Sequence, residues 1–175
     1  MTDFRTRRPA PTEHAPYYSR YIDLVPDGDV LATLGAQVET TAAALRDLPA
    51  ARADLAYAPG KWTVRQVLGH VIDTERVMAY RALRFARADA TPLPGFDENH
   101  FAASAPHGHV AIVELTVELV LLRRANLCFL GQLDAAAWGR GGTANDQPIT
   151  VRALAWVMAG HELHHRRILA ERYGI

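Results

Sequence analysis

The sequence predicts an all-α protein, a four-helix bundle that follows an irregular N-terminal segment. Apolar residues recur at helical spacing in four long segments, which is the mark of helices that bury one face. No segment shows the sustained alternation of apolar and polar residues that is typical of a half-buried strand. The chain of 175 residues is long enough to bury one substantial core, so we expect a single domain over residues 1–175.

The N-terminal segment, residues 1–27, is expected to lack long helices. Four prolines interrupt it, the last of them Pro26. Its tyrosines, which include Tyr17, Tyr18 and Tyr21, offer apolar surface that can pack on the bundle.

The first two helices have clear start signals. Asp29 is an expected N-cap for a helix over 30–48, which Pro49 ends. Thr63 and Gln66 form a capping-box pattern before a second helix that runs to about Asp89. Seven apolar residues share one face of this second helix: Val64, Val67, Leu68, Val71, Met78, Ala82 and Phe85.

The last two helices are expected at 108–133 and from Thr150 to Gly174, a suitable C-terminal glycine. The β-branched residues at 110–122 leave a strand open there. A polar loop at 91–109 joins the second helix to the third, and loops of that length are often functional. The stretch GRGGTANDQP is expected to be a glycine-rich turn.

Composition excludes several classes of protein. Nineteen Lys and Arg residues balance nineteen Asp and Glu residues, so no basic excess indicates a nucleic-acid partner. No apolar stretch is long enough to be a membrane span, and the arginines near the N-terminus are not followed by the apolar run of a secretory signal. We therefore expect a cytoplasmic protein. Cys128 is the only cysteine, and its apolar neighbours predict a buried thiol.

Histidines on the last helix carry the strongest chemical signal. His161 and His165 are four residues apart, so their imidazoles project from one face and can hold one transition-metal ion. Leu154, Met158 and Ile168 share that face, which places both histidines where core residues are expected. Two buried imidazoles without partners are unfavourable, whereas a shared cation satisfies both. The alternative is a pair of ordinary hydrogen-bonded histidines.

His70 on the second helix is the third candidate ligand. It lies at the edge of the apolar face, at a depth that can match His165. Three histidines from two facing helices leave coordination positions open, which is the pattern of a catalytic metal site.

The sequence HELHH also matches the H-E-x-x-H signature of zinc proteases, with Glu162 as the candidate general base. Only ten residues follow His165, and no edge strand is predicted that could bind a peptide, so a protease is disfavoured. Glu162 lies about 100° around the helix from His161, and exposure to solvent is its alternative role.

Other polar residues are secondary candidates. Glu75 lies in the middle of the apolar face and must be paired, for example with an arginine, or be functional. Asp73 and His164 are candidates for the second shell of the metal site. Four histidines are expected to be exposed: His14, His100, His107 and His109.

Several of these motifs together resemble those of one family. The stretch PGKWTVRQVLGHVIDTERVMAYRALRFARAD, then PLPGFDENHFA, and the late HELHHRRIL are similar to the DinB/YfiT-like superfamily of damage-inducible proteins. The resemblance covers the chain from about Tyr17 to the end. It implies an up-down-down-up bundle, commonly dimeric, whose metal ligands match His70, His161 and His165.

The resemblance also sets the hypotheses for function. Relatives include transferases that use bacillithiol or similar low-molecular-weight thiols, so the first hypothesis is a thiol S-transferase that depends on one divalent metal ion. Zinc or nickel is expected first, and iron, cobalt or manganese are alternatives. The second is a metal-dependent hydrolase, with Glu162 or Asp97 as base. The third is a non-enzymatic, metal-binding stress-response homodimer.

Overall fold

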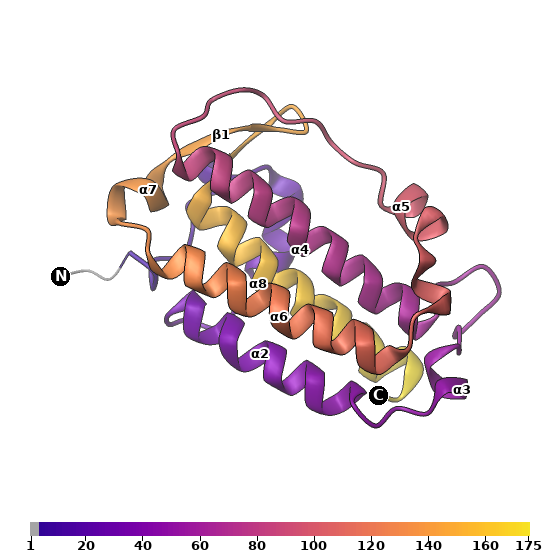
Figure 1. Ribbon diagram of the computed structural model, residues 1–175. Coiled ribbons are helices and arrows are strands. Elements are labelled where there is room, and N and C mark those ends of the chain that lie inside the picture. The colour runs from indigo at the N-terminus through magenta and orange to yellow at the C-terminus, as the bar shows by residue number, and fades with distance from the viewer. Residues whose placement is uncertain (1–3) are drawn as a thin grey trace.

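The computed structural model describes residues 4–175, and its body is a bundle of four long helices (Figure 1). These are α2 (Val30–Leu45), α4 (Val64–Ala86), α6 (Ile112–Gly131) and α8 (Val151–Ile168). Helices α2 and α8 run in one direction and α4 and α6 in the other, which is an up-down-down-up order (Figure 1). Helix α4 packs against α8 and α6, and α2 packs against the same two helices. The predicted all-α bundle is confirmed.

The helix ends follow the predicted capping residues. Thr63 accepts a hydrogen bond from the backbone N–H of Gln66, whose side chain accepts from the backbone N–H of Thr63. Asp29 caps α2 and Thr150 caps α8, each with one side-chain oxygen that accepts a hydrogen bond from a backbone N–H. After Ile168 the chain continues in a π-helical turn, Leu169–Tyr173, which ends at Gly174 with φ of 67°.

The bundle core forms from the faces that the periodicity predicts. All seven apolar residues assigned to one face of α4 are buried, and Phe85 is only 1% exposed. Helix α6 is a helix throughout 112–131, so the strand left open at 110–122 does not form. Burial of the apolar face outweighs the weak helix preference of its β-branched residues.

The connections contain more structure than expected. The loop at 91–109 holds α5 (Glu98–Ser104) and a 3₁₀ turn (Pro106–His109), and two further short helices are α3 (Ala50–Ala53) and α7 (Ala135–Gly139). The expected glycine-rich turn is a hairpin in which β1 (Gly141–Ala144) pairs antiparallel with β2 (Gln147–Thr150). Asn145 and Asp146 both have positive φ, which is the backbone of a two-residue hairpin turn.

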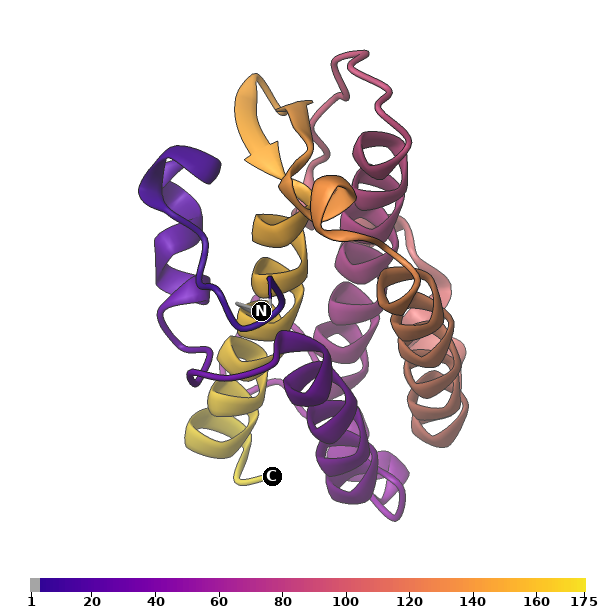
Figure 2. The ribbon, with the colours of Figure 1, turned by 90° about the vertical axis from the view of Figure 1, so that its left-hand side faces the viewer.

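The N-terminal segment packs on the bundle, as predicted. It forms two 3₁₀ turns (Pro11–Glu13 and Pro16–Tyr18) and the short helix α1 (Ser19–Ile22), which contacts α8. Figure 2 shows this segment beside α8, on the side away from α4 and α6. Because it covers that side, α8 is buried around almost its whole circumference in its first three turns.

Cys128 is exposed, so the predicted burial of its thiol is wrong; its side chain points away from the face of α6 that contains Leu119 and Leu130. Among the described residues, no helix combines the length and apolar character that a membrane span requires.

Candidate metal centre

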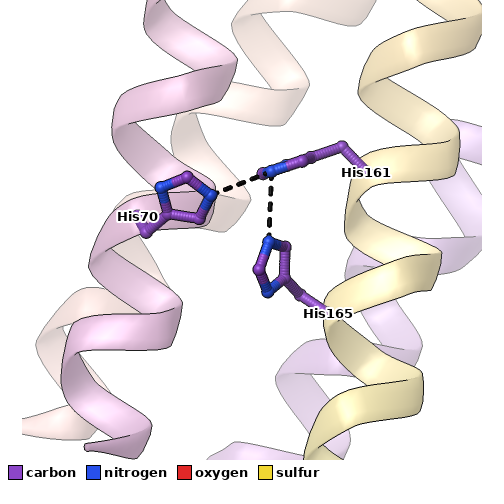
Figure 3. A group of neighbouring side chains, drawn as sticks. All are labelled: His70, His161 and His165. Carbon is purple, nitrogen blue, oxygen red and sulfur yellow. Dashed lines mark hydrogen bonds between the residues drawn. The ribbon is translucent and has the colours of Figure 1, made fainter. Parts of the chain in front are cut away.

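The three predicted ligand histidines meet in the core between α4 and α8 (Figure 3). The Nε2 atom of His161 lies 3.0 Å from Nε2 of His70 and 3.2 Å from Nε2 of His165. One nitrogen from each ring lies within 4.8 Å of the other two, and all three side chains are buried. We call these residues the histidine triad.

Gly69 directly precedes His70, and Gly160 directly precedes His161. Each glycine allows another segment of the chain to approach the helix closely. A Cβ atom on Gly69 would lie 2.0 Å from Nδ1 of His107, and one on Gly160 would lie 2.0 Å from the carbonyl oxygen of Tyr21. Any larger residue would push away the segment that covers the helix at that point. These glycines therefore let the loop at 91–109 and the N-terminal segment close over the backs of the helices that carry the triad.

Aromatic rings hold the triad in place. The indole of Trp62 packs against His70 with ring centroids 4.8 Å apart, and the ring of Tyr21 packs edge-on against His161 at 5.3 Å. The histidine rings also lie against one another, with centroids 4.5–4.9 Å apart. Packing of this kind restricts the side-chain rotamers and keeps the three nitrogens directed toward a common point.

Electrostatics keep the triad neutral. Burial, with a smaller contribution from the charge of His164, lowers the pKa of His70 to about 4. Burial and then His70 lower the pKa of His165 to about 3, and burial and then His165 hold the pKa of His161 well below its usual value. At neutral pH all three imidazoles are thus in the form that binds metal ions.

The triad fits a divalent transition-metal ion. Two nitrogens bound to one tetrahedral zinc ion are ~3.3 Å apart, given Zn–N bonds of about 2.0–2.1 Å. Two of the nitrogen separations, 3.0 and 3.2 Å, are close to this spacing, and all three nitrogens lie within 4.8 Å of one another. The three Nε2 atoms face one another, and no oxygen from the protein takes part in the two contacts between them. A cation bound by all three Nε2 atoms would accept a lone pair from each of these nitrogens, which now face only one another.

Glu162, the candidate base, is directed away from the triad. Its carboxylate accepts a hydrogen bond from Thr41 at 2.5 Å and forms an ion pair of 2.8 Å with Arg123. Glu162 is 1% exposed, so the alternative of a solvent-facing side chain is wrong. Glu162 and His161 project into different parts of the core because consecutive helical residues point about 100° apart.

Glu75 is paired by an arginine, as the sequence analysis required. Both of its oxygens accept hydrogen bonds from Arg123, at 2.7 and 2.6 Å, and Asn126 donates to the first of them at 3.0 Å. Burial would lower the pKa of Arg123, but the hydrogen bonds and charges of Glu75 and Glu162 raise it. We call Glu75, Arg123 and Glu162, with Thr41 and Asn126, the buried ion cluster; it joins all four long helices.

The candidate second-shell residues do not hydrogen-bond to the triad. Asp73 lies 3.5 Å from Arg76 and 4.0 Å from Nε2 of His107. His164 packs its ring against those of Tyr21 and His165, with centroids 5.4 and 5.1 Å away.

The candidate residues outside the long helices differ in their exposure to solvent. Asp97, the other candidate base, is exposed and caps α5 by accepting two backbone hydrogen bonds. His100 and His109 are exposed as predicted. His14 and His107 are buried, contrary to the prediction, because the segments that carry them fold back onto the bundle.

Two cavities reach the triad from different sides. The first, about 310 Å³, is lined by His161 together with Thr74, Arg81 and the three tyrosines of the N-terminal segment. The second, about 250 Å³, is lined by His165, by Trp62 and by Lys61, the only lysine in the chain. The triad therefore lies between two spaces that are each large enough for a small molecule.

Sequence reasoning overlooked Arg123 and Arg81. Arg123 lies in an apolar stripe of α6 with Leu119 and Leu130, and a charged residue in such a stripe is a signal that could have been noticed. Arg81 lies one residue before Ala82 in α4, outside the stripe, and no sequence pattern marks it as buried.

The fold and the triad define a class: four-helix bundle proteins that carry an all-histidine site between two facing helices. The model of the DinB superfamily matches residues 33–169, and the chain belongs to this superfamily. A search of curated proteins finds no match.

Among solved structures, the chain is similar to YfiT from Bacillus subtilis, which is described as a probable metal-dependent hydrolase with an unusual four-helix bundle topology. The TM-score is 0.70 and the identity 21%, over 96% of this chain and 94% of YfiT. At that identity the likeness establishes the fold.

Proposed function

We propose that this protein is a divalent-metal-dependent enzyme that acts on small molecules, with His70, His161 and His165 as metal ligands. The buried, neutral triad supports the metal site. Zinc and nickel are the first candidates, because three imidazoles suit both ions. The ion would supply Lewis acidity, which lowers the pKa of a thiol or water nucleophile that it binds.

One observation favours group transfer between two molecules: the triad lies between two cavities, one at His161 and one at His165. A reaction that joins a low-molecular-weight thiol, for example of the bacillithiol type, to an electrophile needs room for both reactants at one centre. Trp62 and Tyr21 cover His70 and His161 and limit the access of bulk water. We therefore propose a thiol S-transferase.

Hydrolysis is the second candidate, and the description of YfiT favours it. Its two candidate bases are less suitable than expected, since Glu162 is held in ion pairs and Asp97 caps α5. A hydrolase built on this triad would have to rely on the metal ion alone to activate water.

The test combines metal analysis with a thiol screen. We expect purified protein to hold one divalent ion per chain and to conjugate at least one small thiol with a generic aromatic electrophile. His161→Ala should lower metal affinity and turnover by on the order of 100-fold or more, because even second-shell losses cost about 10–100-fold. His100→Ala, an exposed histidine outside the site, is the matched control.

The outcomes separate the hypotheses. Turnover that survives His161→Ala contradicts the proposed centre. Activity on esters without any thiol supports the hydrolase. Metal binding without turnover in the thiol screen or on esters supports the non-enzymatic stress-response protein.

The homodimer implied by the family resemblance stays a prediction. Val113, Val117 and Leu121, spaced four residues apart on α6, are 45–62% exposed and form an apolar stripe on the bundle surface. Light scattering would measure the oligomeric state directly.

A further inference from the structure

Arg81 of α4 is a buried cation without an internal counter-ion. Its side chain is 3% exposed, and it lines the same cavity as His161. Its Nη2 atom donates to the carbonyl oxygen of Pro94 at 2.8 Å, and Nη1 lies 3.9 Å from the sulfur of Met78. It also interacts with the hydroxyl of Tyr18. None of these partners carries a negative charge.

The other buried arginines of the described chain differ in this respect. Arg65 pairs with Asp54 at 2.6 Å, and Arg123 pairs with Glu75 and Glu162. Within residues 4–175, Arg81 forms no such ion pair. A buried charge is strongly unfavourable unless it is paired, so the counter-ion of Arg81 is expected to come from outside the chain.

The cavity also contains an unpaired hydroxyl. Thr74 is 4% exposed, and its Oγ1 atom has no hydrogen-bond partner. Thr74 and Arg81 are four and eleven residues beyond His70, so all three lie within about 40° on one face of α4. The face that presents His70 to the metal centre therefore continues along α4 as a hydroxyl and then a guanidinium.

From these observations we infer that Arg81 binds a carboxylate of the small molecule that occupies this cavity, and that Thr74 contacts the same molecule between Arg81 and the triad. A guanidinium matches a carboxylate with two parallel hydrogen bonds. A single buried cation favours one negative charge over a doubly charged phosphate, and Glu98, an exposed residue on the cavity wall, disfavours further anionic groups. This inference rests on the proposed function in one respect: the other end of the molecule is the group that reacts at the triad.

The geometry sets the shape of the molecule. Eleven residues of helix place the Cα atoms of His70 and Arg81 ~16 Å apart along the axis, and both side chains lean toward the N-terminus of α4, so their ends keep a separation of this order. A carboxylate separated from the reacting group by an extended chain fits this spacing. The walls formed by Tyr18 and Met78 suit an apolar or weakly polar middle section.

Calorimetry with defined probes tests the inference. The probes are ω-mercaptoalkanoates of increasing chain length and the ω-mercaptoalcohols of the same lengths, titrated into metal-loaded and metal-free protein. We expect wild type to bind the best carboxylate about tenfold or more tightly than its alcohol, which is the effect of a charged hydrogen bond. The preference should persist without metal, since Arg81 supplies it.

Variants of matched charge complete the test. Arg81→Gln should abolish the preference for the carboxylate, and Arg81→Lys should retain part of it. Arg87→Gln removes an exposed arginine near the end of the same helix and should leave the preference intact. Glu98→Gln should bind the carboxylate at least as tightly as wild type. Circular dichroism and metal content confirm that each variant is folded and loaded.

Equal binding of carboxylates and alcohols by wild type would overturn the inference, as would a preference that survives in Arg81→Gln or is lost in Glu98→Gln. These outcomes are independent of the metal centre. A protein that binds carboxylates through Arg81 but holds no metal refutes the proposed function alone, and a metal-loaded protein without carboxylate preference refutes only the role of Arg81.

Discussion

The histidine triad and the buried ion cluster lie in the same bundle core, and the consecutive residues His161 and Glu162 belong to one each. Within the cluster, Arg123 pairs with both carboxylates, Asn126 donates to a Glu75 oxygen that Arg123 also contacts, and Thr41 donates to the other oxygen of Glu162. Within the triad, three neutral imidazoles face one another, and one ring nitrogen has no partner at all.

The difference separates a structural role from a functional one. A buried polar group that the protein itself satisfies can hold helices together without any ligand. A buried group that the protein leaves unsatisfied needs a partner from outside, which is a cation for the triad and an anion for Arg81. Three imidazoles that face one another and a buried guanidinium without a carboxylate therefore point to function, whereas Arg123 with its two carboxylates points to a structural contact.

The largest expected effect comes from breaking the cluster. Arg123→Met leaves two carboxylates buried without a cation, and we expect a loss of about 3–5 kcal/mol in the free energy of unfolding. Urea denaturation measures it. Arg124→Met is the matched control, because Arg124 is exposed and pairs with Glu39 on the surface, where an ion pair contributes about 0–1 kcal/mol. Equal losses in the two variants would contradict the assignment of the cluster.

Glu162→Gln tests the difference between the triad and the buried ion cluster at a single position. The amide keeps the shape of the side chain but loses the ion pair with Arg123, so we expect a loss of about 1–3 kcal/mol in stability. Metal content and turnover should match wild type, because the side chain is directed away from the triad. A variant that keeps its stability but loses turnover would instead restore Glu162 as a general base.

The smallest expected effect is the change in stability per pH unit of the metal-free protein. Burial lowers the pKa of His70 from 6.5 to about 4, so the unfolded chain binds its proton more readily than the folded chain. The stability of the metal-free protein should therefore be constant above pH 6.5 and fall as the pH drops from 6.5 toward about 4. The contribution of His70 is about 1.4 kcal/mol per pH unit within that window.

Urea midpoints of the metal-free protein across this window measure the effect. His70→Gln should show a shallower dependence than wild type, whereas His100→Gln, which alters an exposed histidine, should not. The same slope in wild type and His70→Gln would show that His70 is protonated as easily in the folded state as in the unfolded state.

Local sequence determined the long helices and the register of the histidines. Capping at Thr63 and Thr150, the apolar face of α4 and the spacing of His161 and His165 all depend on residues within a few positions of each other, so they can be read without a fold. The position of Gly174 as a left-handed helix end is of the same kind. Asn145 and Asp146 carried a hairpin signal of this local type as well, but the surrounding glycines obscured it.

Tertiary structure decided which polar residues face one another. Whether Glu162 meets the triad or Arg123 depends on how α6 packs between α2 and α4, and whether His107 is buried depends on the small surface of Gly69. The cavity at His161 forms where the N-terminal segment and the loop at 91–109 close over the bundle, and these segments also cover Arg81. The cavity at His165 forms between the segment before α4 and the C-terminal turn. Contacts between residues distant in the chain follow from packing rather than from local preference. The sequence alone therefore indicated the metal centre but not the cavities and charges around it.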